Sequence, residues 1–187
     1  MKSLATFAAA ITIVLAASCA SVPERGTEPG VELQLLTRSD LKRMYGSNFS
    51  TNPYIEPHNL ITRQPREFAV LRLRLALADR LPVSVIAKVV GADGAELARH
   101  YDLEYMKDFT STWGTGDVDV SRRINILEHS YLQSLNFTGY RGSRDYMIIL
   151  MGNYPMPRPA TVQAQVVVGS GEAKLFDFEL PPVDTKF

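Results

Sequence analysis

The chain is poor in cysteine: Cys19 is the only one among its 187 residues. Because a disulfide needs two thiols, no internal disulfide framework exists, and packing must stabilise the folded chain. Charge of either sign is also not in excess, since 20 basic residues balance 20 acidic ones. The chain therefore has neither the excess of basic residues typical of nucleic-acid-binding proteins nor the excess of acidic residues typical of disordered tails. We therefore expect no nucleic-acid partner.

Familiar catalytic motifs are missing as well. The chain has no G-x-S-x-G, no P-loop and no dinucleotide fingerprint. Ser39-Asp-Leu-Lys42 matches the S-x-x-K motif of penicillin-interactive enzymes, but the accompanying K-T-G and S-D-N motifs are absent. Ser39 is better interpreted as the N-cap of a short helix over 40–45 that Gly46 ends. We expect no catalytic residues and no cofactor.

One apolar run stands at the start of the chain. Lys2 precedes the run from Leu4 to Ala17, and small residues lead from there to Cys19. This order is typical of a secretory signal, and the run is shorter than the about 20 apolar residues of a membrane-spanning helix. No later apolar run reaches that length.

The segment Leu15-Ala-Ala-Ser-Cys19 resembles the lipobox of bacterial lipoprotein precursors. It departs from that family's pattern at Ala16, where leucine is favoured. The resemblance implies cleavage after residue 18, lipidation of Cys19 and anchoring to a membrane of the bacterial cell envelope. Ala20 in place of the aspartate that often retains such proteins at the inner membrane favours the outer membrane.

The remaining chain divides into a tether and one domain. Residues 19–30 contain Pro23, Gly26 and Pro29 without apolar periodicity, which predicts a flexible linker. Residues 31–187 have a length suited to a single domain. Removal of residues 1–18 would leave 169 residues, with 19 basic against 20 acidic side chains.

Alternating apolar residues predict a mainly β domain. The clearest strand is 67–77, where leucines alternate with polar or small residues. Further predicted strands are 31–36, 83–90, 97–105, 136–140, 146–151, 161–168 and 174–180. A second short helix is predicted within 117–135, capped by Asp119 and crossing between sheets. This content favours an antiparallel β-sandwich of immunoglobulin-like type, with a small β-barrel as second choice.

The loop between the strands 83–90 and 97–105 is specified further by its residues. A three-residue loop, Ala92-Asp-Gly94, places Val89 opposite Leu97 and keeps the apolar faces of both strands aligned. The same register avoids setting Lys88 opposite Arg99.

Two groups of residues are candidates for binding. Arginines precede and line the polar face of the strand 67–77, and the loop 153–159 contributes an aromatic residue and an arginine; the set is Arg63, Arg66, Arg72, Arg74, Tyr154 and Arg158. Guanidinium groups bind phosphates and acidic polysaccharides. The alternatives are exposed charges that discourage edge pairing and a loop packed on its own domain.

Two patterns suggest metal sites at first sight. Asp117, Asp119, Ser121 and Glu128 resemble an EF-hand calcium loop, but Arg122 occupies the place of its required glycine. Asp117 and Asp119 equally suit the start of a helix. The row His100, Asp102 and Glu104 is interpreted as the solvated face of a strand. We expect no bound metal.

Together these observations predict a membrane-anchored, non-catalytic envelope lipoprotein that binds a protein or glycan partner. One alternative is a small hydrolase that uses His58, His100 or His129 as its base, in a site assembled from dispersed residues. Another is a carrier of an apolar ligand.

Overall fold

The computed structural model describes residues 30–55, 65–113 and 116–182. Cys19, Arg63 and His58 therefore lie outside the described residues. In the described ranges the chain forms eight strands and three helices. The elements are β1 Gly30–Leu36, α1 Arg38–Tyr45, β2 Arg66–Leu77, β3 Leu81–Gly91, β4 Glu96–His100, α2 Leu103–Ser111, α3 Asp117–Ser130, β5 Asn136–Gly139, β6 Gly142–Asn153, β7 Ala160–Val168 and β8 Lys174–Glu179.

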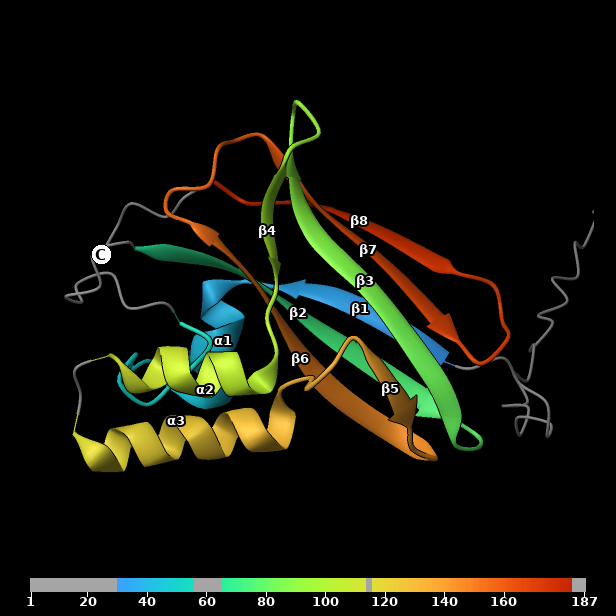
Figure 1. The fold of residues 1–187 in the computed structure, drawn as a ribbon, viewed down its shortest axis with the longest axis horizontal. Coiled ribbons are helices and arrows are strands. Elements are labelled where there is room, and N and C mark those ends of the chain that lie inside the picture. Colours follow the sequence, from blue (N-terminus) through green and yellow to red (C-terminus); the bar gives the residue numbers. More distant parts are fainter. Residues whose placement is uncertain (1–29, 56–64, 114–115, 183–187) are drawn as a thin grey trace, which may run out of the picture.

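All the strands belong to one antiparallel sheet. Its order is β1-β2-β6-β4-β3-β7-β8, and β5 pairs with β3 beside this path. The sheet curls until it is nearly closed into a barrel, while the three helices gather on one side of it (Figure 1). β1 and β8 are the two end strands, so the opening of the barrel lies between them.

The predicted β-sandwich is therefore wrong. A sandwich needs a break in hydrogen bonding between two sheets, but β6 pairs with β2 on one side and β4 on the other, and β4 continues to β3. The apolar faces meet because one twisted sheet closes on itself. The second choice, a small barrel, is closer to this structure, although the barrel stays open.

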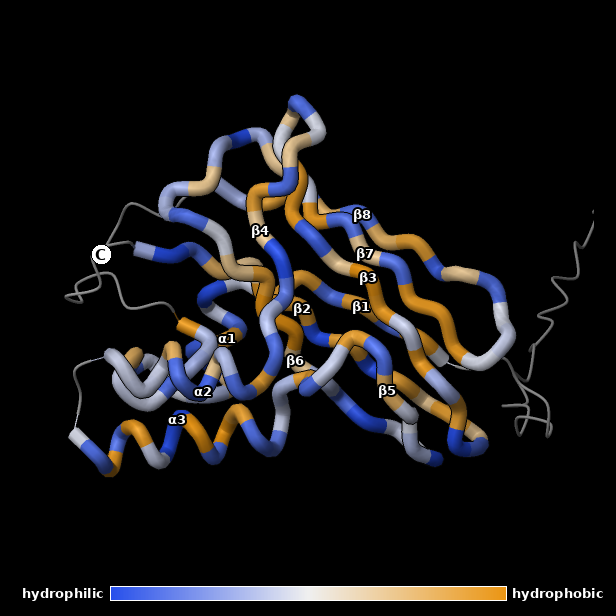
Figure 2. Tube along the Cα trace, viewed as in Figure 1, coloured by the Kyte–Doolittle hydropathy of each residue, from blue (hydrophilic) through white to orange (hydrophobic). Residues whose placement is uncertain are grey.

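Apolar side chains fill both sides of the central strands. Leu71, Leu73 and Leu75 of β2 point into the barrel interior with the valines of β3 and β7. Val70 and Ile149 point outward and pack under the helices. Apolar residues, coloured orange in Figure 2, recur along the strands. The predicted strand 146–151 lies within β6, which is a central strand because it pairs with β2 on one side and β4 on the other.

The predicted strand 97–105 is half wrong, because β4 ends at His100. The chain then turns into α2, whose N-cap is Asp102: its Oδ1 accepts from the backbone N–H of Tyr105 at 2.7 Å. Leu103, Met106 and Thr110 are buried at helical spacing. Asp102 and Glu104 are thus a cap and a first-turn residue, and the row with His100 on a strand face does not exist.

For the β3–β4 turn, the predicted three-residue loop is confirmed, but the predicted register of the two strands is wrong. Gly91 N–H donates to the Ala95 carbonyl at 2.9 Å, and Gly94 has φ +80°, as a three-residue loop requires. A bulge at Leu97 then shifts the pairing, so Ala98 lies opposite Val89. Lys88 and Arg99 consequently face each other. The Arg99 guanidinium lies 5.2 Å from the Tyr101 ring centroid.

The helix predicted within 117–135 is confirmed as α3. Its N-cap is Gly116 rather than Asp119, and it packs beside α2 on the outside of the single sheet instead of crossing between two sheets. Arg123 of α3 is fully buried and donates to the carbonyls of Ser50 and, at 3.0 Å, Thr110. Its guanidinium also lies 5.1 Å from the Trp113 ring centroid. This arginine joins α3 to α2 and to the segment after α1.

The C-terminal hairpin follows its prediction closely. β7 pairs with β8 so that Val162 faces Phe178 and Ala164 faces Phe176. The short strand predicted at 136–140 is β5.

The N-cap of α1 is Thr37, two residues before the predicted Ser39. Thr37 Oγ1 accepts from the backbone N–H of Asp40 at 3.2 Å, and the Asp40 carboxylate accepts from Thr37 N–H at 3.1 Å. This reciprocal capping box explains the earlier start. The helix ends at Gly46, as predicted, with φ +94°.

We predict that Thr37→Ala lowers the free energy of unfolding by about 1 kcal/mol, because it removes the side-chain cap. Ser39→Ala is the matched control and should change it by less than about 0.5 kcal/mol, the usual range for a surface substitution. Urea unfolding followed by circular dichroism measures both. Equal losses in the two variants would contradict the assignment of Thr37 as the cap.

Candidate functional site

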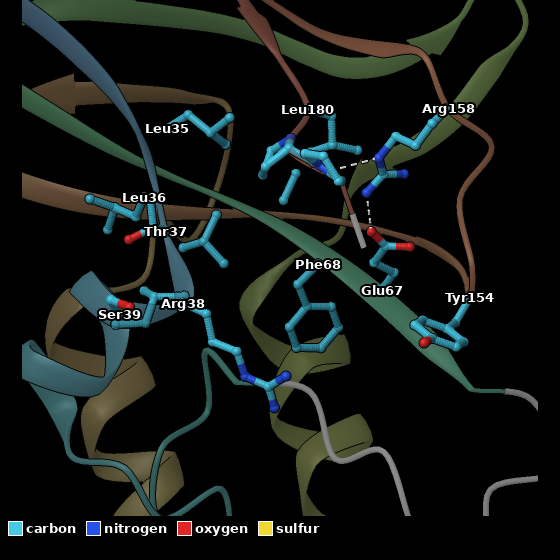
Figure 3. A pocket seen from close by; sticks show the side chains of 15 residues that line it. Leu35, Leu36, Thr37, Arg38, Ser39, Glu67, Phe68, Tyr154, Arg158 and Leu180 are labelled. Atoms are coloured by element: carbon cyan, nitrogen blue, oxygen red, sulfur yellow. Dashed lines mark hydrogen bonds and ion pairs between the residues drawn. The ribbon is translucent and has the colours of Figure 1, made fainter. Parts of the chain in front are cut away.

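A cavity of about 270 Å³ lies where β1 passes into α1. β1 and α1 form one wall, the start of β2 forms the floor, and the β6–β7 loop and the segment after β8 complete it (Figure 3). The lining residues are Leu35, Leu36, Thr37, Arg38, Ser39, Leu41, Glu67, Phe68, Ala69, Val70, Tyr154, Arg158, Leu180, Pro181 and Pro182. The cavity therefore sits at one end of the opening between the two end strands.

An ion pair between Glu67 and Arg158 forms the polar side of the cavity. Glu67 is only 7% exposed, although it is charged. The Arg158 guanidinium donates to Glu67 Oε1, and Glu67 Oε2 accepts from the Met156 N–H at 2.7 Å. Arg158 Nε also donates to the Pro181 carbonyl at 2.8 Å. The pair thus fastens the proline-rich loop and the C-terminal segment to the start of β2 (Figure 3).

Sequence reasoning missed Glu67, although a signal was present. Glu67 has the same parity along β2 as Ala69 and Leu71, which point into the barrel. A carboxylate on an inward-facing position needs a partner, because a buried unpaired charge is costly. The parity of the strand therefore pointed to a buried ion pair at this end of the sheet.

The rest of the lining is mostly apolar. Leucines and prolines from β1 and the segment after β8 face Phe68 and Val70 of β2. Phe68 also packs against Phe109 of α2, with ring centroids 6.2 Å apart. Arg38, in the first turn of α1, adds a second guanidinium to the lining (Figure 3). The charged residues of the lining are two arginines and one glutamate, a net positive set.

The predicted binding residues separate into two groups. Tyr154 and Arg158 line the cavity, and Arg66 lies beside it at the start of β2, donating to the Asn153 side chain. Arg72 and Arg74 lie farther along the outer face of β2. Arg72 donates to Gln34 at 2.6 Å, and Arg74 pairs with Asp145 at 2.8 Å. These two arginines are engaged by neighbouring strands and take no part in the cavity.

The calcium-loop resemblance has no counterpart in the structure. Asp117, Asp119, Ser121 and Glu128 all belong to the continuous helix α3, whose backbone cannot wrap around an ion as the EF-hand loop does. Glu128 forms an ion pair with Lys107 of α2 at 3.1 Å. Within the described ranges, no three His, Cys, Asp or Glu side chains gather at a position that could hold a metal ion.

The two described histidines have different surroundings. His129 is exposed on α3, with Nδ1 2.7 Å from the Asn125 carbonyl of its own helix. His100 is largely buried, and its ring stacks on Tyr131 with centroids 5.3 Å apart. Neither lines the cavity described above.

Hydrogen bonds define the tautomer of His100. The Tyr131 hydroxyl donates its one proton to the Tyr101 carbonyl at 2.6 Å, so His100 Nδ1–H must be the donor to Tyr131 Oη, 3.0 Å away. His100 Nε2 is then the unprotonated nitrogen, and it is buried without a hydrogen-bond partner among the described residues. Burial lowers the pKa of His100, and the Ile149 backbone and the Asp102 carboxylate offset this only in part. The neutral imidazole is a structural hydrogen-bond donor.

No protein-family model matches the chain, and no curated protein or solved structure is significantly similar to it. Among the described residues, none of the helices has the length and apolar character needed to span a membrane.

We predict that Arg158→Met lowers the free energy of unfolding by about 3 kcal/mol, because it leaves the Glu67 carboxylate buried without its partner. The double variant Glu67→Gln, Arg158→Met should recover most of this loss, since the charge is removed and the glutamine oxygen still accepts from Met156. Urea unfolding of both variants tests the pair. A double variant as unstable as the single one would contradict this account.

A second prediction concerns pH. Because the pKa of His100 is lower in the folded than in the unfolded chain, the unfolded chain binds the proton more readily. Its contribution to stability is therefore complete above the unfolded pKa of about 6.5 and is lost as the pH falls below that value, by at most about 1.4 kcal/mol per pH unit. Between neutral and mildly acidic pH, the free energy of unfolding should change less steeply with pH in His100→Gln than in the unchanged protein. Identical slopes against pH would contradict the prediction.

Proposed function

We propose that this protein is a lipoprotein of the bacterial cell envelope whose domain is a non-catalytic binding module. Lipid on Cys19 would anchor it, with the outer membrane favoured. The cavity between β1, α1 and β2 would bind an apolar side chain of a protein partner. The observation that carries this proposal is the position and lining of that cavity.

The cavity lies at the far end of β1 from the tether. Residues 19–30 lead into β1 at Gly30, and the cavity begins at Leu35 and Leu36, where the strand ends. Six residue steps of an extended strand span about 20 Å. A domain anchored through its N-terminal tether would thus present the cavity on the side away from the point of attachment.

The chemistry of the lining favours a protein segment over a glycan. The walls are mainly leucine, proline, phenylalanine and valine, and the carboxylate of Glu67 is already bonded to Arg158 and to the Met156 N–H. A sugar would find few acceptors for its hydroxyl groups here. One large apolar side chain suits a cavity of this size and lining.

The lining also lacks the parts of a hydrolytic site. Of the residues that line the cavity, none is a histidine or a cysteine, and Ser39 and Thr37 have no base beside them in that lining. Thr37 instead donates to the Asp40 carboxylate at 2.7 Å as part of the helix cap. This arrangement supports binding rather than nucleophilic chemistry.

A pull-down from envelope extracts tests the cavity with a matched pair of variants. Ser39→Trp places a bulky ring at the exposed rim of the cavity, and Ser121→Trp places the same ring on the exposed face of α3. We expect a protein captured by the unchanged chain to be lost with Ser39→Trp and kept with Ser121→Trp. Loss or retention in both variants would rule out the cavity as the binding site.

The proposed lipid anchor is tested by comparing the unchanged protein with a Cys19→Ala variant, both produced in the cells that supply the envelope extracts. The unchanged protein should enter the detergent phase on Triton X-114 partition and carry the added mass of acyl chains, because several buried chains anchor durably. Cys19→Ala should remain without that mass. An unchanged protein free of acyl chains would overturn the lipoprotein assignment and leave the result on the cavity standing.

A further inference from the structure

We propose that the opposite end of the barrel, where the tether joins, carries a docking surface for an anionic phospholipid membrane. The surface consists of Arg80, Arg141 and Arg144 around the ring of Tyr140, and we call these three residues the tether-end arginines. This inference rests on the proposed lipid anchor for its biological setting, although the surface can be tested without the lipid.

The strand register brings the tether-end arginines beside the start of β1. Gly30 pairs with Ala76 near the end of β2, and Leu77 pairs with Gly142 at the start of β6. Leu81 at the start of β3 pairs with Gly139 at the end of β5. The β2–β3 turn, the β5–β6 turn and the first residue of β1 therefore share one end of the sheet, at the lower right of Figure 1.

Tyr140 organises the cluster. Tyr140 is 43% exposed, and two guanidinium carbons lie over its ring: that of Arg80, in the β2–β3 turn, at 4.8 Å from the ring centroid, and that of Arg144, near the start of β6, at 4.6 Å. Arg141 is exposed at the next position of the chain. The arrangement gathers three cations on a small surface around an amphipathic ring, the side chain type that is enriched at membrane interfaces.

The cations of this cluster are not neutralised by the protein. In the parts of the chain that the structure describes, none of the tether-end arginines forms an ion pair. Asp145 is engaged by Arg74 at 2.8 Å, and Asp79, adjacent to Arg80, is exposed. Three guanidinium groups near one another without bonded carboxylates suit a surface of phosphate groups.

A hollow of about 690 Å³ borders the cluster. Its lining includes Tyr140, Arg144 and Tyr146 and also the carboxylates of Glu128 and Asp145, so Arg144 is the group there that suits a headgroup phosphate. The Tyr146 hydroxyl is buried there and has no hydrogen-bond partner within the described ranges. Arg144 and Tyr146, both on β6, thus place a guanidinium and a hydroxyl group in the lining of the hollow.

The length of the tether favours a membrane over other polyanions. Ten residues, 20–29, separate Cys19 from Gly30, the first residue of β1. As the flexible linker that the sequence predicts, this segment would span about 18 Å on average and at most about 40 Å when extended. The tether end of the barrel would stay this close to the bilayer, within reach of its charged surface, while the cavity faces away.

Sedimentation with vesicles tests the surface without the lipid. The probe protein is the chain from residue 19 onward with Cys19→Ala, which keeps every residue of the described fold. We expect it to bind vesicles of phosphatidylcholine mixed with phosphatidylglycerol and not vesicles of phosphatidylcholine alone. Replacing one tether-end arginine by glutamine should weaken binding about fivefold, and replacing all three about a hundredfold.

The matched control changes the same charge elsewhere. Arg43, Arg99 and Arg122 are exposed arginines on α1, β4 and α3, and their triple replacement by glutamine should leave vesicle binding within about twofold, because their charges lie away from the tether end. Circular dichroism confirms that both triple variants fold.

Three outcomes would overturn the proposal. They are equal weakening by the two triple variants, equal binding to neutral and anionic vesicles, and binding of soluble inorganic polyphosphate through the tether-end arginines without binding of vesicles. The absence of acyl chains on Cys19 would leave the vesicle result unchanged, so the anchor and the docking surface fail separately.

Discussion

The antiparallel pairing of β2 with β6 is the contact on which the other elements depend. The two strands pair over their full 12 residues, and both carry apolar side chains on both faces. One face can be buried only if the sheet curls around it, and the other only if helices cover it. The nearly closed barrel and the layer of three helices are the two solutions to this one demand for burial.

The same demand explains the buried polar groups. Where β2 begins, the inward position is occupied by Glu67, and the loop after β6 returns Arg158 to meet it. Where the helices cover the outer face, Arg123 donates to the carbonyls of Ser50 and Thr110, in the segment after α1 and in α2. In both places an arginine bonded to buried groups joins parts of the chain that the strand pairing does not hold together.

The alternation of apolar and polar residues predicted most of the strands, because it indicates directly which residues share a face of the sheet. Alternation does not indicate which strand pairs with which, and a sandwich and a curled single sheet differ only in that pairing.

The bulge at Leu97 and the helix after His100 were missed for related reasons. Both depend on what lies beside the segment: Ala98 fits the barrel interior opposite Val89, and Asp102 finds the N–H of Tyr105. Of the predicted binding residues, Tyr154 and Arg158 meet at the cavity, whereas Arg72 and Arg74 are taken by Gln34 and Asp145 on neighbouring strands.

The strands also separate the two surfaces that carry the proposals. The long strands of the barrel run from one end of it to the other, so a property placed at one end is held rigidly away from the other. Gly30 enters the sheet beside the tether-end arginines, and Leu36 leaves it beside the cavity. If charge draws the tether end of the barrel to a bilayer, the rigid sheet places the cavity end on the side away from the membrane. No further interaction is needed for this orientation. Orientation of the cavity then follows from the length and direction of β1, and the tether would need only to keep the domain near the membrane.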